Sequence, residues 1–133
     1  MELTFDFPGG ARVDAHLRGF TIPTDQPPDA TAPSPFDLFI ASMGACAAYY
    51  ILEFCRRRDI PTDGLRVTER VEKGPDKMVS RVAIDVDFPE TFPEKYRAAA
   101  IRAADLCSVK RHLERPPVIE VNARAHDAAG AAA

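Results

Sequence analysis

The stretch Ala32-Pro-Ser-Pro-Phe-Asp-Leu-Phe-Ile-Ala-Ser-Met-Gly-Ala-Cys46 begins the longest apolar segment of the chain, which continues to Arg58. Ser34 is a typical helix N-cap, and Pro35 suits the first helical position. Asp37 lies three residues after the cap, where a capping box places an acidic side chain and the helix dipole favours negative charge. The pattern therefore predicts a long apolar helix that begins at Ser34.

Ser42 and Gly44 interrupt this helical pattern. Glycine costs about 1 kcal/mol relative to alanine inside a helix, so we expect a break or kink near Gly44. A helix that restarts there would place Cys46 in its first turn. Free N–H groups and the helix dipole stabilise a thiolate at such a position.

Alternation of apolar and polar residues predicts strands on both sides of this helix. The expected strands cover residues 3–7, 12–18, 20–22, 65–72, 78–88 and 118–125. A second capping box, Thr91-Phe-Pro-Glu94, predicts a helix from Pro93 to about Leu106, followed by one or two further turns over 108–114. We expect a single α+β domain over 1–133, with a Pro-rich loop at 24–33 and a flexible tail at 127–133.

Charge and composition narrow the classes of partner. The net charge is −3 and no basic stripe is present, so nucleic acid is not an expected partner. The apolar run 38–54 contains Glu53 and is shorter than a typical membrane span, which predicts no membrane insertion. The N-terminal residues lack the basic and apolar regions of a signal peptide. Three cysteines in such a chain favour reduced thiols in the cytoplasm.

The cysteines are the main candidates for chemistry. Cys55 follows Cys46 by nine residues, which is half a turn away on a helix, so we interpret Cys55 as a core residue. For Cys46 a core role and a reactive role are both open on spacing alone. No CxxC or HxxxH spacing occurs, so no metal site is predicted. The sequence also lacks a Gly-rich phosphate loop and a serine nucleophile elbow.

The motif Ala32-Pro-Ser-Pro-x-Asp-Leu-x-x-Ala-Ser-x-Gly-Ala-Cys46, with Cys107-Ser-Val sixty-one positions later, resembles the OsmC/Ohr family. The order of the expected elements is also similar, so the resemblance covers nearly the whole chain. It implies an α+β fold in which antiparallel sheets wrap around two central helices. It further implies an intertwined homodimer with its sites at the subunit interface.

The best known members of this family are thiol peroxidases that reduce organic hydroperoxides. The resemblance implies that Cys46 attacks the peroxide and becomes a sulfenic acid, that Cys107 condenses with it to a disulfide, and that an external dithiol restores both thiols. No bound cofactor is implied. The family also supplies an arginine to the thiolate from a turn after the first strand. Here that turn reads Gly9-Gly10-Ala11-Arg12, so Arg12 is the first candidate and Arg18 the second; a solvated strand charge is the alternative for either.

One position departs from the peroxidases. They hold the arginine with a glutamate where this chain has Phe36, and Asp37 matches an adjacent acidic position of the less characterised OsmC-like branch. Asp37 is therefore a candidate site residue or only a helix cap. Apolar residues near Cys46 favour an organic hydroperoxide or another small apolar ligand: Phe36, Phe39, Met43 and Tyr50. The alternative function is a dimeric small-ligand-binding module without efficient peroxidase activity.

Overall fold

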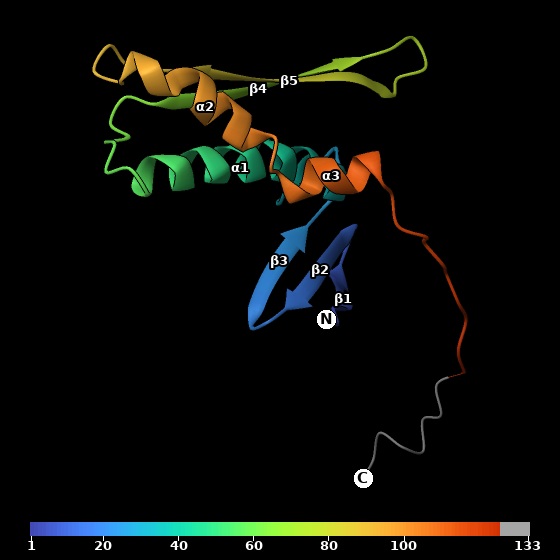
Figure 1. The fold of residues 1–133 in the computed structure, drawn as a ribbon. Coiled ribbons are helices and arrows are strands. Elements are labelled where there is room, and N and C mark those ends of the chain that lie inside the picture. Colours follow the sequence, from blue (N-terminus) through green and yellow to red (C-terminus); the bar gives the residue numbers. More distant parts are fainter. Residues whose placement is uncertain (126–133) are drawn as a thin grey trace.

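The computed structural model describes residues 1–125 and contains three helices and two antiparallel sheets within them (Figure 1). The predicted flexible tail at 127–133 lies outside the described residues. The elements follow in the order β1 (Thr4–Gly9), β2 (Arg12–Leu17), β3 (Phe20–Thr24), α1 (Pro35–Arg56), β4 (Arg66–Lys73), β5 (Val79–Asp87), α2 (Glu94–Ala104) and α3 (Ser108–Glu114). The mixed α and β composition of the fold is thus as the sequence predicts.

Helix α1 is central to the fold, because α2, α3 and β4 all pack on it. Its N-terminus has the predicted capping box: Ser34 Oγ accepts from the Asp37 N–H, and the Asp37 carboxylate accepts from the Ser34 N–H. The predicted break at Gly44 is wrong, since the helix is continuous over 22 residues. Cys46 therefore lies in the middle of α1 and not in a first helical turn.

Gly44 has a packing role that explains its place inside a helix. Glu69 of β4 crosses α1 at this point, and a Cβ atom added to Gly44 would lie 2.6 Å from Glu69 Oε2. A larger residue would push the carboxylate away. The glycine thus permits a close approach between helix and strand, a use of glycine that sequence spacing alone does not distinguish from a helix break.

The hydrophobic core lies between α1, α2 and the β4–β5 hairpin. Its fully buried members are Ile51 and Cys55 on α1 and Ala100 on α2, joined by Ile60 and Phe92 from the connecting segments. The small Ala100 side chain lets α1 and α2 approach closely, as the alanine-rich sequence of α2 predicts. Residues on β4 and β5, such as Val67 and Val86, complete the cluster.

Strands β1, β2 and β3 form a separate antiparallel sheet in that order, and β4 pairs only with β5 among the described residues. Arg18 and Gly19 both have positive φ, which suits the two-residue turn that joins β2 to β3. The three-stranded sheet lies on the other side of α1 from the β4–β5 hairpin (Figure 1). Its strands contact chiefly one another, and its Phe5, Phe7 and Phe20 side chains are exposed.

Two predicted features are absent from the described residues. Thr91 does not cap α2, whose N-cap is Pro93 with no side-chain hydrogen bond, because the helix begins only at Glu94. The strand predicted at 118–125 does not form: this segment has no regular secondary structure, and Val118, Ile119 and Val121 are each more than 80% exposed. An alternating sequence becomes a strand only beside another strand, and none of the described strands lies against this segment.

Helix α1 is longer than the apolar run 38–54, from which the sequence predicted no membrane insertion. By length and composition its 22 residues could cross a membrane. Met43, Ala47, Ile51 and Cys55 are nevertheless buried along one face against the rest of the fold. This burial is typical of the central helix of a globular protein, which passes the same test of length and composition.

Candidate thiol site

Helix α1 and the start of α3 bring Cys46 and Cys107 together. Both cysteines are free, and each thiol shifts the pKa of the other. Cys46 is partly exposed, whereas Cys107 is only 2% exposed. The fold thus pairs one accessible thiol with one buried thiol, although sixty residues separate them in the chain.

Cys107 is held in place by the backbone around it. It is the N-cap of α3, where its sulfur accepts a hydrogen bond from the Lys110 N–H at 3.4 Å. Its thiol also points to the Met43 carbonyl oxygen of α1 at 4.0 Å. The usual N-cap residues are Ser, Thr, Asp and Asn. In α3 the sulfur of Cys107 takes the place of their side-chain oxygen.

The first turn of α3 supplies the polar surroundings of Cys46. Burial alone would raise the pKa of the Cys46 thiol, but hydrogen bonds from the Val109 N–H, the Cys107 thiol, and the Ser108 side chain and N–H outweigh it and lower that pKa. The Ser108 hydroxyl lies 3.7 Å from the Cys46 sulfur. The thiolate is therefore favoured by the N-terminus of α3, and not by the N-terminus of its own helix as the sequence suggested.

Cys107 has the opposite tendency. Burial raises the pKa of the Cys107 thiol, and the nearby Cys46 raises it further, against a hydrogen bond from the Lys110 N–H. The pKa values of the two neighbouring thiols thus move in opposite directions, which favours a thiolate at Cys46 and a protonated thiol at Cys107.

Cys55 is fully buried in the core, where burial raises the pKa of its thiol. The interpretation of Cys55 as a core residue is confirmed. Glu53, which is seven residues after Cys46, pairs with Arg56 in the last turn of α1 and with Arg57, the C-cap residue.

Arg12 does not join the thiols within this chain. It lies at the start of β2, where its guanidinium donates to both carboxylate oxygens of the largely buried Asp14 at 2.7 and 2.8 Å. This pairing lowers the pKa of Asp14 and raises the pKa of Arg12. Arg18 lies in the exposed turn after β2, where it contacts the sulfur of Met1. Arg12 and the turn with Arg18 belong to the three-stranded sheet, which lies on the other side of α1 from the β4–β5 hairpin (Figure 1).

The carboxylate of Asp37 is engaged in capping its own helix. It accepts from the Ser34 hydroxyl and N–H at 2.7 and 2.9 Å, and these bonds lower the pKa of Asp37. The structure brings it to the capping box of α1 and gives it no contact with either thiol.

Three of the four predicted ligand-binding residues line one groove. Phe36, Phe39 and Met43 face the β4–β5 turn across a volume of about 500 Å³. Met43 also lines an adjoining apolar hollow of about 420 Å³ that reaches Cys107 and the β5 residues Val82 and Ile84. Tyr50 lies outside both; it follows Cys46 by one helical turn and packs edge-on against Tyr49.

Ser108 and Val109 belong to the Cys107-Ser-Val motif, which assigned them no role of their own; their hydrogen bonds lower the pKa of the Cys46 thiol. Glu69 was not anticipated. Burial raises the pKa of Glu69 against a hydrogen bond from the Gly44 N–H, and its Oε1 atom is buried without a partner in the described chain. Among residues 1–125 no group of three or more His, Cys, Asp or Glu could hold a metal ion.

The chain is similar to a known protein family and to several solved structures. The family model described as OsmC-like protein matches residues 28–122. A Psychrobacter arcticus 273-4 protein, provisionally named an osmotic stress induced and detoxification response protein, is 26% identical with a TM-score of 0.67, over 82% of this chain and 85% of its own.

Two further solved structures share the fold at lower identity. An OsmC like protein from Mycoplasma pneumoniae is 14% identical with a TM-score of 0.69, over 85% of this chain and 86% of its own. A hypothetical protein from Aquifex aeolicus VF5 is 13% identical with a TM-score of 0.70, over 86% and 87%. A comparison with curated protein sequences finds no significant match.

Proposed function

Because the chain belongs to the OsmC-like protein family, we propose that it is a thiol-dependent peroxidase that reduces organic hydroperoxides through Cys46 and Cys107. The observation that carries this proposal is the pairing of a partly exposed Cys46, whose pKa is lowered, with a buried Cys107 whose pKa is raised. The apolar hollows beside Met43 and Cys107 support an organic substrate.

The reaction follows from the two thiols. The Cys46 thiolate attacks the terminal peroxide oxygen; the O–O bond breaks, a proton is taken up, and the products are the alcohol and a Cys46 sulfenic acid. Cys107 then displaces water from the sulfenic sulfur and forms the Cys46–Cys107 disulfide. An external dithiol is oxidised to its own disulfide and returns both cysteines to thiols. No bound cofactor takes part.

Exposed apolar surface supports a homodimer as the working form. Phe5, Phe7 and Phe20 stand out from a sheet that packs on little else in its own chain, and Val118, Ile119 and Val121 extend from a segment without a strand partner. An intertwined second copy would cover both. It would also let Arg12 approach a thiol of the partner, which its own chain does not permit. We place the dimer in the cytoplasm.

The decisive experiment treats the reduced protein with cumene hydroperoxide and follows the cysteines by mass spectrometry. A Cys46–Cys107 disulfide should form as the alcohol appears. Cys46→Ser should abolish turnover, and Cys107→Ser should stop at a sulfenic acid that dimedone captures. Cys55→Ser is the matched control and should retain turnover. A protein whose Cys46 stays a thiol under these conditions is not a peroxidase.

One observation favours a second candidate. Phe36 stands where the peroxidases of the family have a glutamate, and it lines an apolar groove. The alternative is a dimeric module that binds a small apolar ligand without turnover. Saturable binding of cumyl alcohol by a protein that leaves cumene hydroperoxide intact would establish this function.

A further inference from the structure

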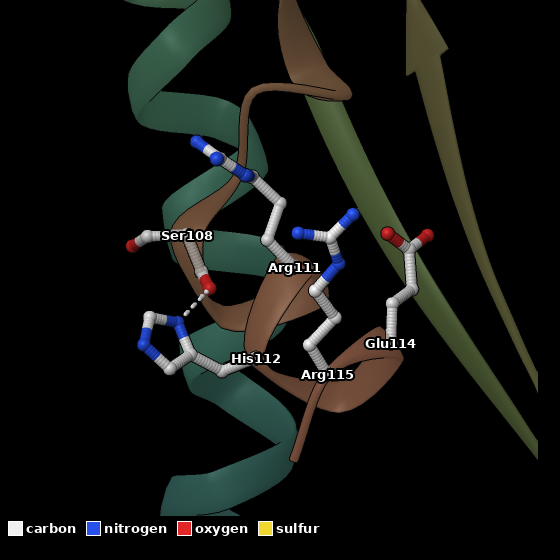
Figure 2. A pocket seen from close by; sticks show the side chains of 5 residues that line it. All are labelled: Ser108, Arg111, His112, Glu114 and Arg115. Atoms are coloured by element: carbon white, nitrogen blue, oxygen red, sulfur yellow. Dashed lines mark hydrogen bonds between the residues drawn. The ribbon is translucent and has the colours of Figure 1, made fainter. Parts of the chain in front are cut away.

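The outer face of α3 carries a group of cations directly beside the thiol site. Arg111 and Arg115 are one helical turn apart, and with Ser108, His112 and Glu114 they line a hollow of about 410 Å³. Figure 2 shows Arg111 and Arg115 extending from the same side of α3, with Ser108 and His112 on one flank and Glu114 on the other. Neither arginine has an ion-pair partner in the part of the chain that the structure describes.

Ser108 connects these cations to the reactive sulfur. Its hydroxyl lies 3.7 Å from Cys46 Sγ, and its carbonyl oxygen accepts a hydrogen bond from His112 Nδ1 at 2.6 Å (Figure 2). The hydrogen bond orients the imidazole along the wall of the hollow. Ser108 therefore lies both beside the Cys46 sulfur and on the wall of the hollow that the two arginines line.

An apolar compartment meets the cationic one at the same two residues. Ser108 and His112 also line a second hollow of about 400 Å³, whose other walls include Phe39, Val109 and Leu113. The site therefore has an apolar part and a positively charged part that share an edge next to the thiol. Guanidinium groups bind carboxylates through paired hydrogen bonds, and apolar walls bind hydrocarbon.

We propose that Arg111 and Arg115 form an anion subsite of the thiol centre, which binds the carboxylate of a ligand whose hydrocarbon part lies against Phe39 and Leu113. The carboxylate belongs either to the hydroperoxide or to the dithiol that reduces the enzyme. The inference rests on the proposed function for the identity of these two reactants.

The test measures discrimination by charge in Cys46→Ser protein, which cannot turn over. Isothermal titration calorimetry compares 10-hydroxydecanoate, an alcohol of the kind that hydroperoxide reduction releases, with its uncharged methyl ester. The ratio of the two affinities should fall about tenfold in Arg111→Gln/Arg115→Gln protein, because hydrogen bonds to charged groups are the stronger kind. Arg102→Gln, an exposed helix arginine outside both hollows, is the matched control and should keep the ratio. Arg111→Lys/Arg115→Lys should restore part of it.

A second arm identifies the source of the anion. The rate at which dimercaptosuccinate reduces the oxidised enzyme is divided by the rate for uncharged dithiothreitol. If only the ratio of affinities falls in Arg111→Gln/Arg115→Gln protein, the subsite binds the hydroperoxide. If only the ratio of reduction rates falls, the subsite binds the reductant. Both ratios unchanged in a variant that melts at the normal temperature would overturn the proposal. Since the calorimetric arm needs no turnover, a protein without peroxidase activity still tests the subsite.

Discussion

At the scale of the residue, the environment of Cys46 predicts unusual reactivity. Hydrogen bonds from the first turn of α3 outweigh burial and lower the pKa of Cys46. Its alkylation by iodoacetamide should therefore reach half of the maximal rate at a lower pH than that of an ordinary cysteine. Peptide mapping of the folded protein measures this directly. Cys55, whose thiol is fully buried with a raised pKa, is the internal control and should react only on unfolding.

The partly buried carboxyl group of Glu69 should make the free energy of unfolding depend on pH. Because burial raises the pKa of Glu69 in the folded chain, the folded state keeps this proton to a higher pH than the unfolded chain does. Stability is therefore lost as pH rises from the ordinary glutamate pKa through the raised one. Glu69→Gln should stabilise the protein at pH 7.5 by on the order of 1 kcal/mol, and the gain should vanish below the ordinary glutamate pKa.

Urea denaturation at several pH values measures the gain from Glu69→Gln. Glu72→Gln is the control from the same strand: Glu72 is exposed and pairs with Arg81 at 2.9 Å. Surface pairs contribute at most about 1 kcal/mol, so this change should not stabilise the protein. A gain from Glu69→Gln that does not depend on pH would show that the carboxylate is not the cause.

At the scale of the element, the capping box of α1 predicts a local contribution to stability. Ser34→Ala removes the acceptor for the Asp37 N–H and should lower the free energy of unfolding by about 1 kcal/mol. Thr91→Ala is the matched control, because α2 makes no side-chain cap with Thr91. Its effect should stay within about 0.5 kcal/mol. Equal losses in the two variants would contradict the assignment of the caps.

The elements that the sequence predicted correctly are those whose signals are local. Ser34 and Asp37 interact three residues apart, and the alternation at β4 and β5 is contained in one hairpin. Gly44 was misinterpreted because its reason lies on β4, where Glu69 approaches the helix. The segment 118–125 was predicted as a strand because its alternation is correct, but a strand also requires a neighbour that the pattern does not specify. For Gly44 and for the segment 118–125, the structure is decided by contacts with residues that are distant in the sequence.

The same distinction applies to the thiol site. The motifs indicated Cys46 and Cys107, but the hydrogen bonds that tune Cys46 come from Ser108 and Val109, which only the packing of α3 on α1 brings near. Arg12 was a candidate by motif, yet within its own chain it pairs with Asp14. Whether it serves a thiol remains a prediction that depends on a second copy of the chain.

At the scale of the whole molecule, the exposed apolar surface predicts self-association. Sedimentation velocity should show a dimer at micromolar concentration. Phe7, which is 81% exposed on β1, should lie in the interface, so Phe7→Glu should shift the protein toward the monomer. Glu2→Gln changes a charge near the same strand without removing apolar area and should leave the dimer intact. A monomeric parent protein would rule out the intertwined arrangement.

The position of Cys107 at the start of α3 has a consequence for how the oxidised protein would behave. Its sulfur accepts a hydrogen bond from the Lys110 N–H, and that bond caps the N-terminus of a helix of only seven residues. A disulfide would draw this sulfur toward Cys46 and away from the Lys110 N–H, so oxidation would leave α3 uncapped and prone to fray. Amide deuterium uptake across 108–114 would then report the redox state of the protein without any chemical label.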